Sequence, residues 1–291
     1  LSNLYWITVS LTLNENFKFL IPIALILIPA FLAIFYGLAI YFLFLFNIRK
    51  LISNLFLFSL LMGIVEFLRG IILTGFPWNL IAYSFSNNLE IIQITSFIGT
   101  YAFNMLCITF FASPAIFILR KNRKEIAVCI FFLLSPIILY VVGSSKIKTF
   151  QSSELIQNDF VIRAIGSNID LGRFYGNTDT VSVIDELIEL SEPNLDNRTL
   201  FIWPEGIIPN INQSELKDYD FLFKNKFNKN HLLGIGINSY QNDIDKDRFY
   251  NSFSFYDHEI NLINIYNKVN LVPFGEFLPF EKILGRIGLK S

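Results

Sequence analysis

The sequence predicts a multi-pass α-helical membrane domain followed by a domain of alternating strands and helices. Hydrophobic residues make up 53% of the chain, 32 residues are Phe, and charged residues make up only 16%, whereas a soluble globular domain has about 25% charged residues. The apolar residues gather in the N-terminal half, and the composition becomes mixed after Ser145. This pattern excludes disorder, and two Cys are too few for a disulfide scaffold.

Four apolar segments are long enough to cross a bilayer, because a spanning helix needs about 20 apolar residues. The first carries Pro22 and Pro29, which membrane helices tolerate. We therefore expect a transmembrane domain over residues 1–148, with spans at about 18–46, 51–68, 90–119 and 126–143.

Basic residues in the short loops predict the orientation, because cytoplasmic loops carry an excess of Lys and Arg. Arg49 and Lys50 follow the first span, and Arg120, Lys121, Arg123 and Lys124 follow the third. Arg69, Lys146 and Lys148 argue the other way but are fewer. We therefore expect both basic clusters inside the cell and residues 149–291 outside the membrane, on the periplasmic side of a bacterial inner membrane.

Residues 149–291 alternate between β-rich runs and helical patterns, which is typical of a layered α/β domain. The run WPEG (203–206) ends an apolar strand, so that Glu205 projects from the rim of a sheet, where ligands collect. A second run, YNKVNLVPFGEFLP (266–279), places Lys268 at a strand end and Glu276 in a loop. Taken singly, Glu205 is an ordinary turn residue, and Lys268 with Glu276 an ordinary surface ion pair. The expected strands are 160–165, 199–205, 232–240, 250–257 and 261–268, with the last two as an antiparallel pair, and the expected helices are 178–191 and 214–228.

Taken together, these two runs resemble the nitrilase or carbon-nitrogen hydrolase superfamily and, within it, the apolipoprotein N-acyltransferase family. TGFPWNL (74–80), SFIGTY (96–101) and YWI (5–7) are also similar to the membrane half of that family. The resemblance covers nearly the whole chain and implies an αββα sandwich for 149–291, with its C-terminal part missing.

The resemblance implies three site residues: Glu205 as general base, Lys268 as stabiliser of the oxyanion, and Glu276 as a second essential carboxylate. The roles agree with the chemistry, because a thiol that attacks an ester must lose its proton, here to a carboxylate of raised pKa, and the oxyanion needs a fixed positive charge. The family's nucleophilic Cys is missing. Cys107 and Cys129 fall inside predicted spans, where a nucleophile is not expected. We therefore expect this chain to be a fragment truncated at both ends, with the nucleophile beyond Ser291. The fragment itself is expected to be inactive.

Other residues have weaker signals. Trp78 is a candidate for the lipid side, although an aromatic residue at the membrane boundary is more often an interfacial anchor, and Trp203 is a candidate for the substrate side. Glu66 and Arg69, one turn apart, are expected to form a local ion pair. His231 and His258 lack zinc-site spacing, so neither a metal nor a cofactor is predicted. The role of Asn168 is left open, because Gly166 and Ser167 depart from the family's Gln-Pro-Asn.

The expected function is transfer of an acyl chain from a phospholipid to the α-amino group of S-diacylglyceryl-cysteine lipoproteins through a thioester. The partners are then a phospholipid donor, a diacylated lipoprotein acceptor and the membrane, and the net charge of −1 argues against nucleic acid. One alternative is a membrane-tethered amidase that acts on a small amide. The other is a non-catalytic scaffold or transport protein, although the spans hold few ionisable residues.

Overall fold

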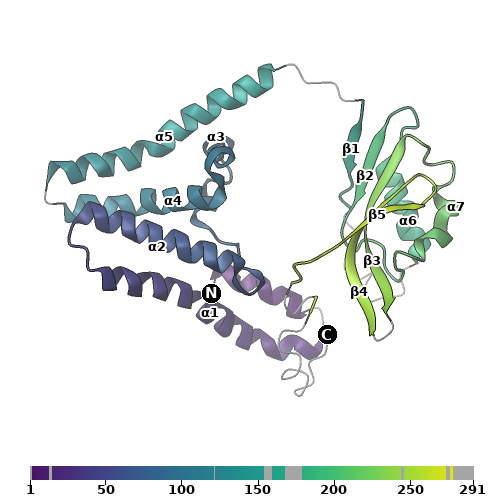
Figure 1. Cartoon of the computed structure of the whole chain (residues 1–291), viewed down its shortest axis with the longest axis horizontal. Helices are drawn as coiled ribbons and strands as arrows, with labels where there is room; N and C mark the ends of the chain where they lie inside the picture. The colour runs from purple at the N-terminus through teal and green to yellow at the C-terminus, as the bar shows by residue number, and fades with distance from the viewer. Residues whose placement is uncertain are drawn as a thin grey trace. The chain divides into compact units, whose positions relative to one another are not determined.

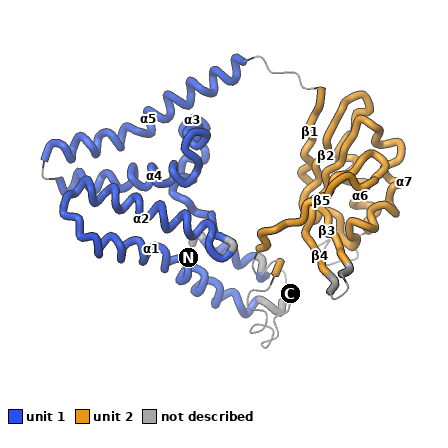
Figure 2. Tube along the Cα trace, in the orientation of Figure 1, with its two compact units in different colours: residues 1–154 blue, residues 155–291 orange. Residues whose placement is uncertain are grey.

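The computed structural model describes residues 2–12, 15–120, 122–153, 159–167, 179–243, 246–272 and 276–277. The chain divides into two compact units, residues 1–154 and 155–291, coloured separately in Figure 2. Each unit is described below by itself.

Within the described part of the first unit, four helices are long and apolar enough to cross a membrane, as the hydropathy pattern predicts. They are α1 (Ile21–Phe46), α2 (Leu51–Ile71), α4 (Thr95–Leu119) and α5 (Arg123–Ser152), labelled in Figure 1. Two 3₁₀ segments, Ser2–Thr12 and Glu15–Leu20, precede α1. These findings agree with a multi-pass membrane protein.

The chain between α2 and α4 is broken into short turns. It forms 3₁₀ turns at Ile72–Thr74 and Ile81–Phe85 and the short helix α3 (Leu89–Ile92) before α4 begins. Backbone at positive φ occurs at Leu73, Gly75 and Asn79, a conformation that interrupts a helix. The third long helix begins at Thr95, later than the expected segment 90–119, because the start of that segment forms the separate helix α3.

The last membrane helix extends beyond the segment 126–143 in both directions. Its start is fixed by a capping box, in which the Asn122 side chain accepts a hydrogen bond from the Glu125 backbone N–H at 3.0 Å and the Glu125 side chain caps Asn122. Hydropathy detects the apolar middle of such a helix and misses its polar ends.

The described residues of the second unit form one mixed five-stranded sheet in the order β1-β2-β3-β4-β5. The three strands β1 (Val161–Ala164), β2 (Thr199–Trp203) and β3 (His231–Asp243) are parallel. The strands β4 (Lys246–Tyr256) and β5 (Leu262–Asn267) continue the sheet antiparallel. The expected antiparallel pairing of 250–257 with 261–268 is confirmed, and β3 also pairs antiparallel with β4, from Leu233 opposite Tyr256 to Asp243 opposite Lys246.

Helices cover one face of this sheet. The helix α6 (Thr180–Ser191), the 3₁₀ turn Leu216–Tyr219 and α7 (Asp220–Phe223) supply buried side chains that pack on alternate residues of β2 and β3 (Figure 1). We call the opposite side of the sheet the open face. It exposes Ile162 by 61% and Leu232 by 41%. The described residues therefore form one layered sheet, and the second sheet of a sandwich is not among them.

Candidate functional site

Glu205 lies at the carboxyl end of a parallel strand. β2 ends at Trp203, Pro204 turns the chain, and Gly206 follows at a φ of 57°. The turn brings the backbone of Glu205 over the open face of β3, against Gly236. Its side chain is 62% exposed, so that the carboxylate is held at the sheet rim and remains accessible.

Lys268 is placed by the β4–β5 ladder. It directly follows β5, and its backbone N–H donates to the carbonyl of Asn251 on β4 at 2.8 Å. Side chains alternate along a strand, and Ser252, Ser254 and Tyr256 face the helices as buried residues. Asn251 and the Lys268 opposite it therefore lie on the open face, the side on which Glu205 sits.

Glu276 is fixed by its own loop. Its backbone N–H donates to the Val272 carbonyl at 2.9 Å, and its Oε2 accepts the Val272 N–H at 2.7 Å. These two bonds leave Oε1 free to face Lys268, with the side chain 21% exposed. Pro273, Phe274 and Gly275, which the sequence placed in this loop, lie outside the described residues.

The structure brings these three residues together. Lys268 Nζ lies 3.0 Å from Glu205 Oε1 and 2.8 Å from Glu276 Oε1. The pairing of Lys268 with Glu276 alone would suit a surface ion pair. The second carboxylate, which comes from a different strand end, makes the arrangement a cluster of one cation between two anions.

Asn251 is a fourth member that the sequence analysis missed. Its Nδ2 donates to Glu205 Oε1 and, at 2.7 Å, to Glu276 Oε1. Amide and ammonium therefore bind the same two oxygens from two sides. A signal was present in the sequence, because YNSFSFYD (250–257) places one polar side chain among the open-face positions that Phe253 and Phe255 otherwise occupy. The role of Asn251 can be inferred from this pattern only once the register between β4 and β5 is known.

The ionisation of the cluster differs from the expectation for Glu205. Hydrogen bonds from Lys268 and Asn251 lower the pKa of Glu205, so that the expected raised pKa is wrong. Burial would raise the pKa of Glu276, but the hydrogen bonds from Lys268, Val272 and Asn251 outweigh it and lower the pKa. The hydrogen bond to Glu276 raises the pKa of Lys268. All three groups are therefore charged at neutral pH.

This arrangement offers a proton acceptor beside a fixed positive charge. Glu205 is ionised and exposed, so that it can take a proton from an incoming group. The Lys268 ammonium can stabilise a negative oxygen that develops next to it. With one cation between two carboxylates, the cluster has a net charge of −1 before substrate binds. It holds no nucleophile of its own.

The other residues of this unit that the sequence analysis considered lie away from the Glu205 cluster or outside the described residues. Trp203 is fully buried (0% exposed) in the core under α6 and α7, where its Nε1 donates to Ser191 Oγ at 2.9 Å, and not at a surface facing substrate. His231 is also buried, and its Nε2 lies 2.9 Å from the Asn194 carbonyl. His258 lies in the turn between β4 and β5. Asn168 lies outside the described residues.

The cysteines and Trp78 belong to the first unit. Cys107 and Cys129 are buried in α4 and α5 among apolar side chains. Trp78 is 48% exposed, and its ring lies 5.8 Å from that of Trp6. Paired aromatic rings of this kind are typical of a membrane interface.

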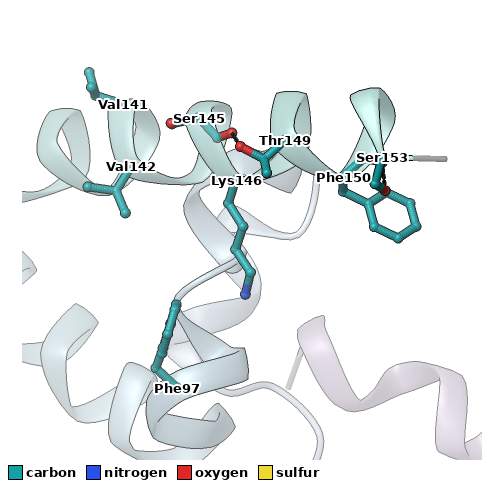
Figure 3. A pocket seen from close by; sticks show the side chains of 8 residues that line it. All are labelled: Phe97, Val141, Val142, Ser145, Lys146, Thr149, Phe150 and Ser153. Carbon is teal, nitrogen blue, oxygen red and sulfur yellow. Dashed lines mark hydrogen bonds between the residues drawn. The ribbon is translucent and has the colours of Figure 1, made fainter.

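A groove of about 670 Å³ lies along the last turns of α5. Figure 3 shows Lys146 reaching from α5 toward Phe97, with its Nζ 4.5 Å from the ring centroid. The lining contains neither a carboxylate nor a thiol: Phe97, Val141, Val142, Ser145, Lys146, Thr149, Phe150 and Ser153. The groove therefore lacks the groups for catalysis, and the Glu205 cluster remains the candidate active site.

The fold and this cluster define a class of protein: a helical membrane unit linked to an α/β sheet that carries a Glu-Lys-Glu-Asn cluster at its rim. Comparison with known proteins narrows the class. Residues 1–113 match the family model described as Apolipoprotein N-acyltransferase N-terminal domain.

Curated relatives with the name Apolipoprotein N-acyltransferase match nearly the whole chain. The protein of Rhodopseudomonas palustris (strain ATCC BAA-98 / CGA009) is 28% identical over 302 residues, which cover 98% of this chain and 55% of the relative. That of Brucella melitensis biotype 1 is 28% identical over 308 residues, covering 100% and 55%. The chain therefore spans about half the length of these relatives. The resemblance found in the sequence is confirmed in both halves of the chain.

Proposed function

We propose that this chain is part of an apolipoprotein N-acyltransferase, an enzyme that moves an acyl chain from a phospholipid to the α-amino group of a diacylglyceryl-cysteine lipoprotein. The observation that carries the proposal is Lys268 Nζ within 3.0 Å of two carboxylates, one at the end of β2 and one in the loop after β5. The names of the relatives support the reaction class, and the four apolar helices suit substrates that are anchored in a bilayer.

In the first half-reaction a cysteine thiol attacks the ester carbonyl of the phospholipid. Glu205 takes the thiol proton, the sulfur–carbon bond forms, and the oxyanion is stabilised by the Lys268 ammonium. The carbon–oxygen ester bond then breaks, and the leaving alcohol of the lysophospholipid receives the proton from Glu205. The product is a thioester on the enzyme.

In the second half-reaction the lipoprotein amine attacks the thioester. Glu205 accepts a proton from the amine and returns it to the departing thiol, which leaves an amide on the lipoprotein and the free enzyme. Glu276 and Asn251 hold Lys268 and Glu205 in place in both steps. The two cysteines of residues 1–291, Cys107 and Cys129, do not suit the role of nucleophile, because both are buried in membrane helices. The proposal therefore assigns this role to a different cysteine of the full-length protein.

The α/β unit is, in this proposal, one half of a nitrilase-like αββα sandwich on the periplasmic side of the inner membrane. The apolar side chains exposed on the open face, such as Ile162 and Leu232, support a second layer there. The basic residues after α1 and between α4 and α5 support the orientation.

The deciding experiment uses the full-length parent protein in membranes with radiolabelled phospholipid. We expect a hydroxylamine-sensitive labelled acyl group on the wild-type protein and none on Glu205→Gln, which keeps the shape of the side chain and loses the base. Glu186→Gln, the same change at an exposed position of α6, is the control and should label normally. Wild-type labelling in Glu205→Gln would exclude Glu205 as the base.

A further inference from the structure

A buried polar cluster joins three helices of the membrane unit. Glu66 and Arg69 on α2 are 1% and 3% exposed. Glu66 accepts hydrogen bonds from Asn104 Nδ2 on α4 and from Tyr36 Oη on α1, the latter at 3.3 Å. Charged side chains at such positions are expensive to bury and are commonly functional.

The expected ion pair between Glu66 and Arg69 is wrong, because Arg69 Nη1 donates to the Trp78 carbonyl and Nε and Nη2 make no hydrogen bond. Glu66 is instead held by Asn104 and Tyr36. Arg69 donates from Nη1 to the carbonyl of Trp78 at 2.9 Å, and the Phe76 N–H donates to the Arg69 carbonyl at 2.7 Å. The loop 75–78 is thus folded back onto the end of α2 by Arg69.

Two nitrogens of Arg69 remain without an acceptor. Nε and Nη2 are both buried and make no hydrogen bond. They form one edge of the planar guanidinium, with two parallel N–H groups that match a pair of oxygens on one phosphate or carboxylate. Leaving charged donors without an acceptor in a buried place is strongly unfavourable. The Nε and Nη2 groups of Arg69 can therefore bind an acceptor that the described side chains do not supply.

The surroundings of Arg69 indicate the depth at which that acceptor lies. Arg69 is two residues from the end of α2. The Phe76 ring lies 5.6 Å from its guanidinium, and the Trp78 ring lies 5.1 Å from that of Phe76. Trp78 and its neighbour Trp6 are about half exposed. A helix end with clustered Trp residues is typical of the headgroup level of a bilayer.

At that level the abundant acceptor with two oxygens on one centre is a lipid phosphate. We propose that the Nε/Nη2 edge of Arg69 binds the phosphate of a phospholipid headgroup, and that Phe76 moves to admit it. The identification of this lipid as the acyl donor rests on the proposed function, whereas the binding does not. A water molecule bridging Arg69 to Glu66 is the competing occupant.

The first test measures lipid binding to the full-length protein in detergent by native mass spectrometry. The probes are dioleoylphosphatidylglycerol, dioleoylglycerol, which lacks the phosphate, and inorganic phosphate. We expect retention of the phospholipid and not of dioleoylglycerol, and an affinity about ten- to a hundredfold weaker in Arg69→Gln, the loss of a bidentate charge-assisted pair. Competition by inorganic phosphate alone would assign the site to free phosphate.

Two variants separate the guanidinium edge from general charge. Arg69→Lys keeps the positive charge but lacks the paired donors, so it should also bind phosphatidylglycerol more weakly. Lys148→Gln removes one exposed charge from α5 and should bind normally. Wild-type affinity in both Arg69 variants would overturn the proposal and favour the bridging water. Glu205→Gln should keep the lipid and lose the acyl-enzyme, so that each proposal can fail separately.

A crosslinking experiment avoids any change at Arg69, should its variants fail to fold. A photoreactive benzoylphenylalanine replaces Phe76, and the lipids crosslinked in membranes are identified by mass spectrometry. We expect adducts of phospholipids in excess over those of diacylglycerol supplied at equal amounts. Equal yields of the two lipids would show that phosphate does not direct binding and would overturn the proposal.

Discussion

Gly236 lies directly against the backbone of Glu205: a Cβ atom placed on Gly236 would come within 2.5 Å of Glu205 Cα and 2.6 Å of the Pro204 carbonyl oxygen. Both contacts are with backbone, which cannot rotate away as a side chain can. The position of the proposed general base is therefore set by the absence of a side chain on the neighbouring strand.

Gly236→Ala should displace Glu205 and lower acyl-enzyme formation by about a hundredfold, since a shift of about 1 Å in a reacting group can have that effect. The measurement is thioester labelling of the full-length protein together with its melting temperature. Gly166→Ala, where a Cβ meets nothing within 4 Å, is the matched control. Normal labelling of Gly236→Ala would show that the turn at Glu205 tolerates this shift.

Asn251→Leu should lower acyl-enzyme formation and move the acid limb of its pH profile upward. The substitution keeps the approximate side-chain shape and removes a donor that lowers the pKa of both Glu205 and Glu276. Asn251→Asp should have a larger effect, because a third carboxylate beside Lys268 raises both pKa values further. A uniform loss of rate with an unchanged pH profile would point to a purely structural role.

The cluster also predicts how stability depends on pH. Glu205 and Glu276 have lowered pKa values, so their contribution to stability is present above the usual value of 4.5 and is lost as the pH falls below it. Lys268 has a raised pKa, so its contribution is present below 10.5 and is lost as the pH rises through the folded value. Between these limits the cluster contributes a nearly constant stability.

Lys268→Met tests this linkage. Without the cation, the two carboxylates repel each other and their pKa values rise, so the variant should be less stable at neutral pH and should lose less stability than the wild type as the pH falls. Melting temperatures measured at intervals from pH 3 to pH 8 should diverge between the two proteins toward neutral pH. Parallel curves would mean that the exposed carboxylates are already screened by solvent.

Membrane orientation is tested with single introduced cysteines. Ser214→Cys lies in an exposed loop of the α/β unit, and Lys124→Cys lies in the first turn of α5. An impermeant thiol reagent applied to cells with a permeabilised outer membrane should label the first position and not the second. Lys124 is preferred to its neighbour Asn122, which caps α5. Reversed labelling would invert the proposed topology.

A polypeptide of residues 1–291 should form no acyl adduct, although it contains Glu205, Lys268 and Glu276. A base and an oxyanion charge assist only an attack that a nucleophile makes, and both thiols are buried in membrane helices, where a thiolate is disfavoured. Mass spectrometry after incubation with labelled phospholipid in detergent provides the measurement. An acyl adduct on Cys107 or Cys129 would contradict the proposed nucleophile.

The sequence predicted the membrane helices and most strands because both depend on local patterns. Long apolar runs identified α1 and α2 closely. The ends of α5 were missed, because the Asn122 cap is a local polar interaction inside a charged segment. Likewise α4 begins later than its apolar segment, because the first residues of that segment belong to the separate short helix α3 (Leu89–Ile92).

The site was predicted only in part, for a different reason. Glu205 and Lys268 were identified by their motifs, whereas Asn251 and Gly236 take part through strand register, which single-sequence patterns do not fix. The lowered pKa of Glu205 likewise depends on two donors from other strands. The unpaired guanidinium nitrogens of Arg69 could not be predicted either. Sequence spacing predicts an ion pair with Glu66 one turn away, whereas the hydrogen bonds of both residues depend on the tertiary structure.

The ladder between β4 and β5 has a consequence for how this chain tolerates insertions and deletions. Asn251 and Lys268 face each other through a single hydrogen bond, and the turn at 257–261 sets which residue lies opposite Asn251. Adding or removing one residue there would slide β5 by one position and send the lysine side chain to the helix-covered face. The length of this hairpin is thus constrained by chemistry, whereas its exposed turn residues are free to vary.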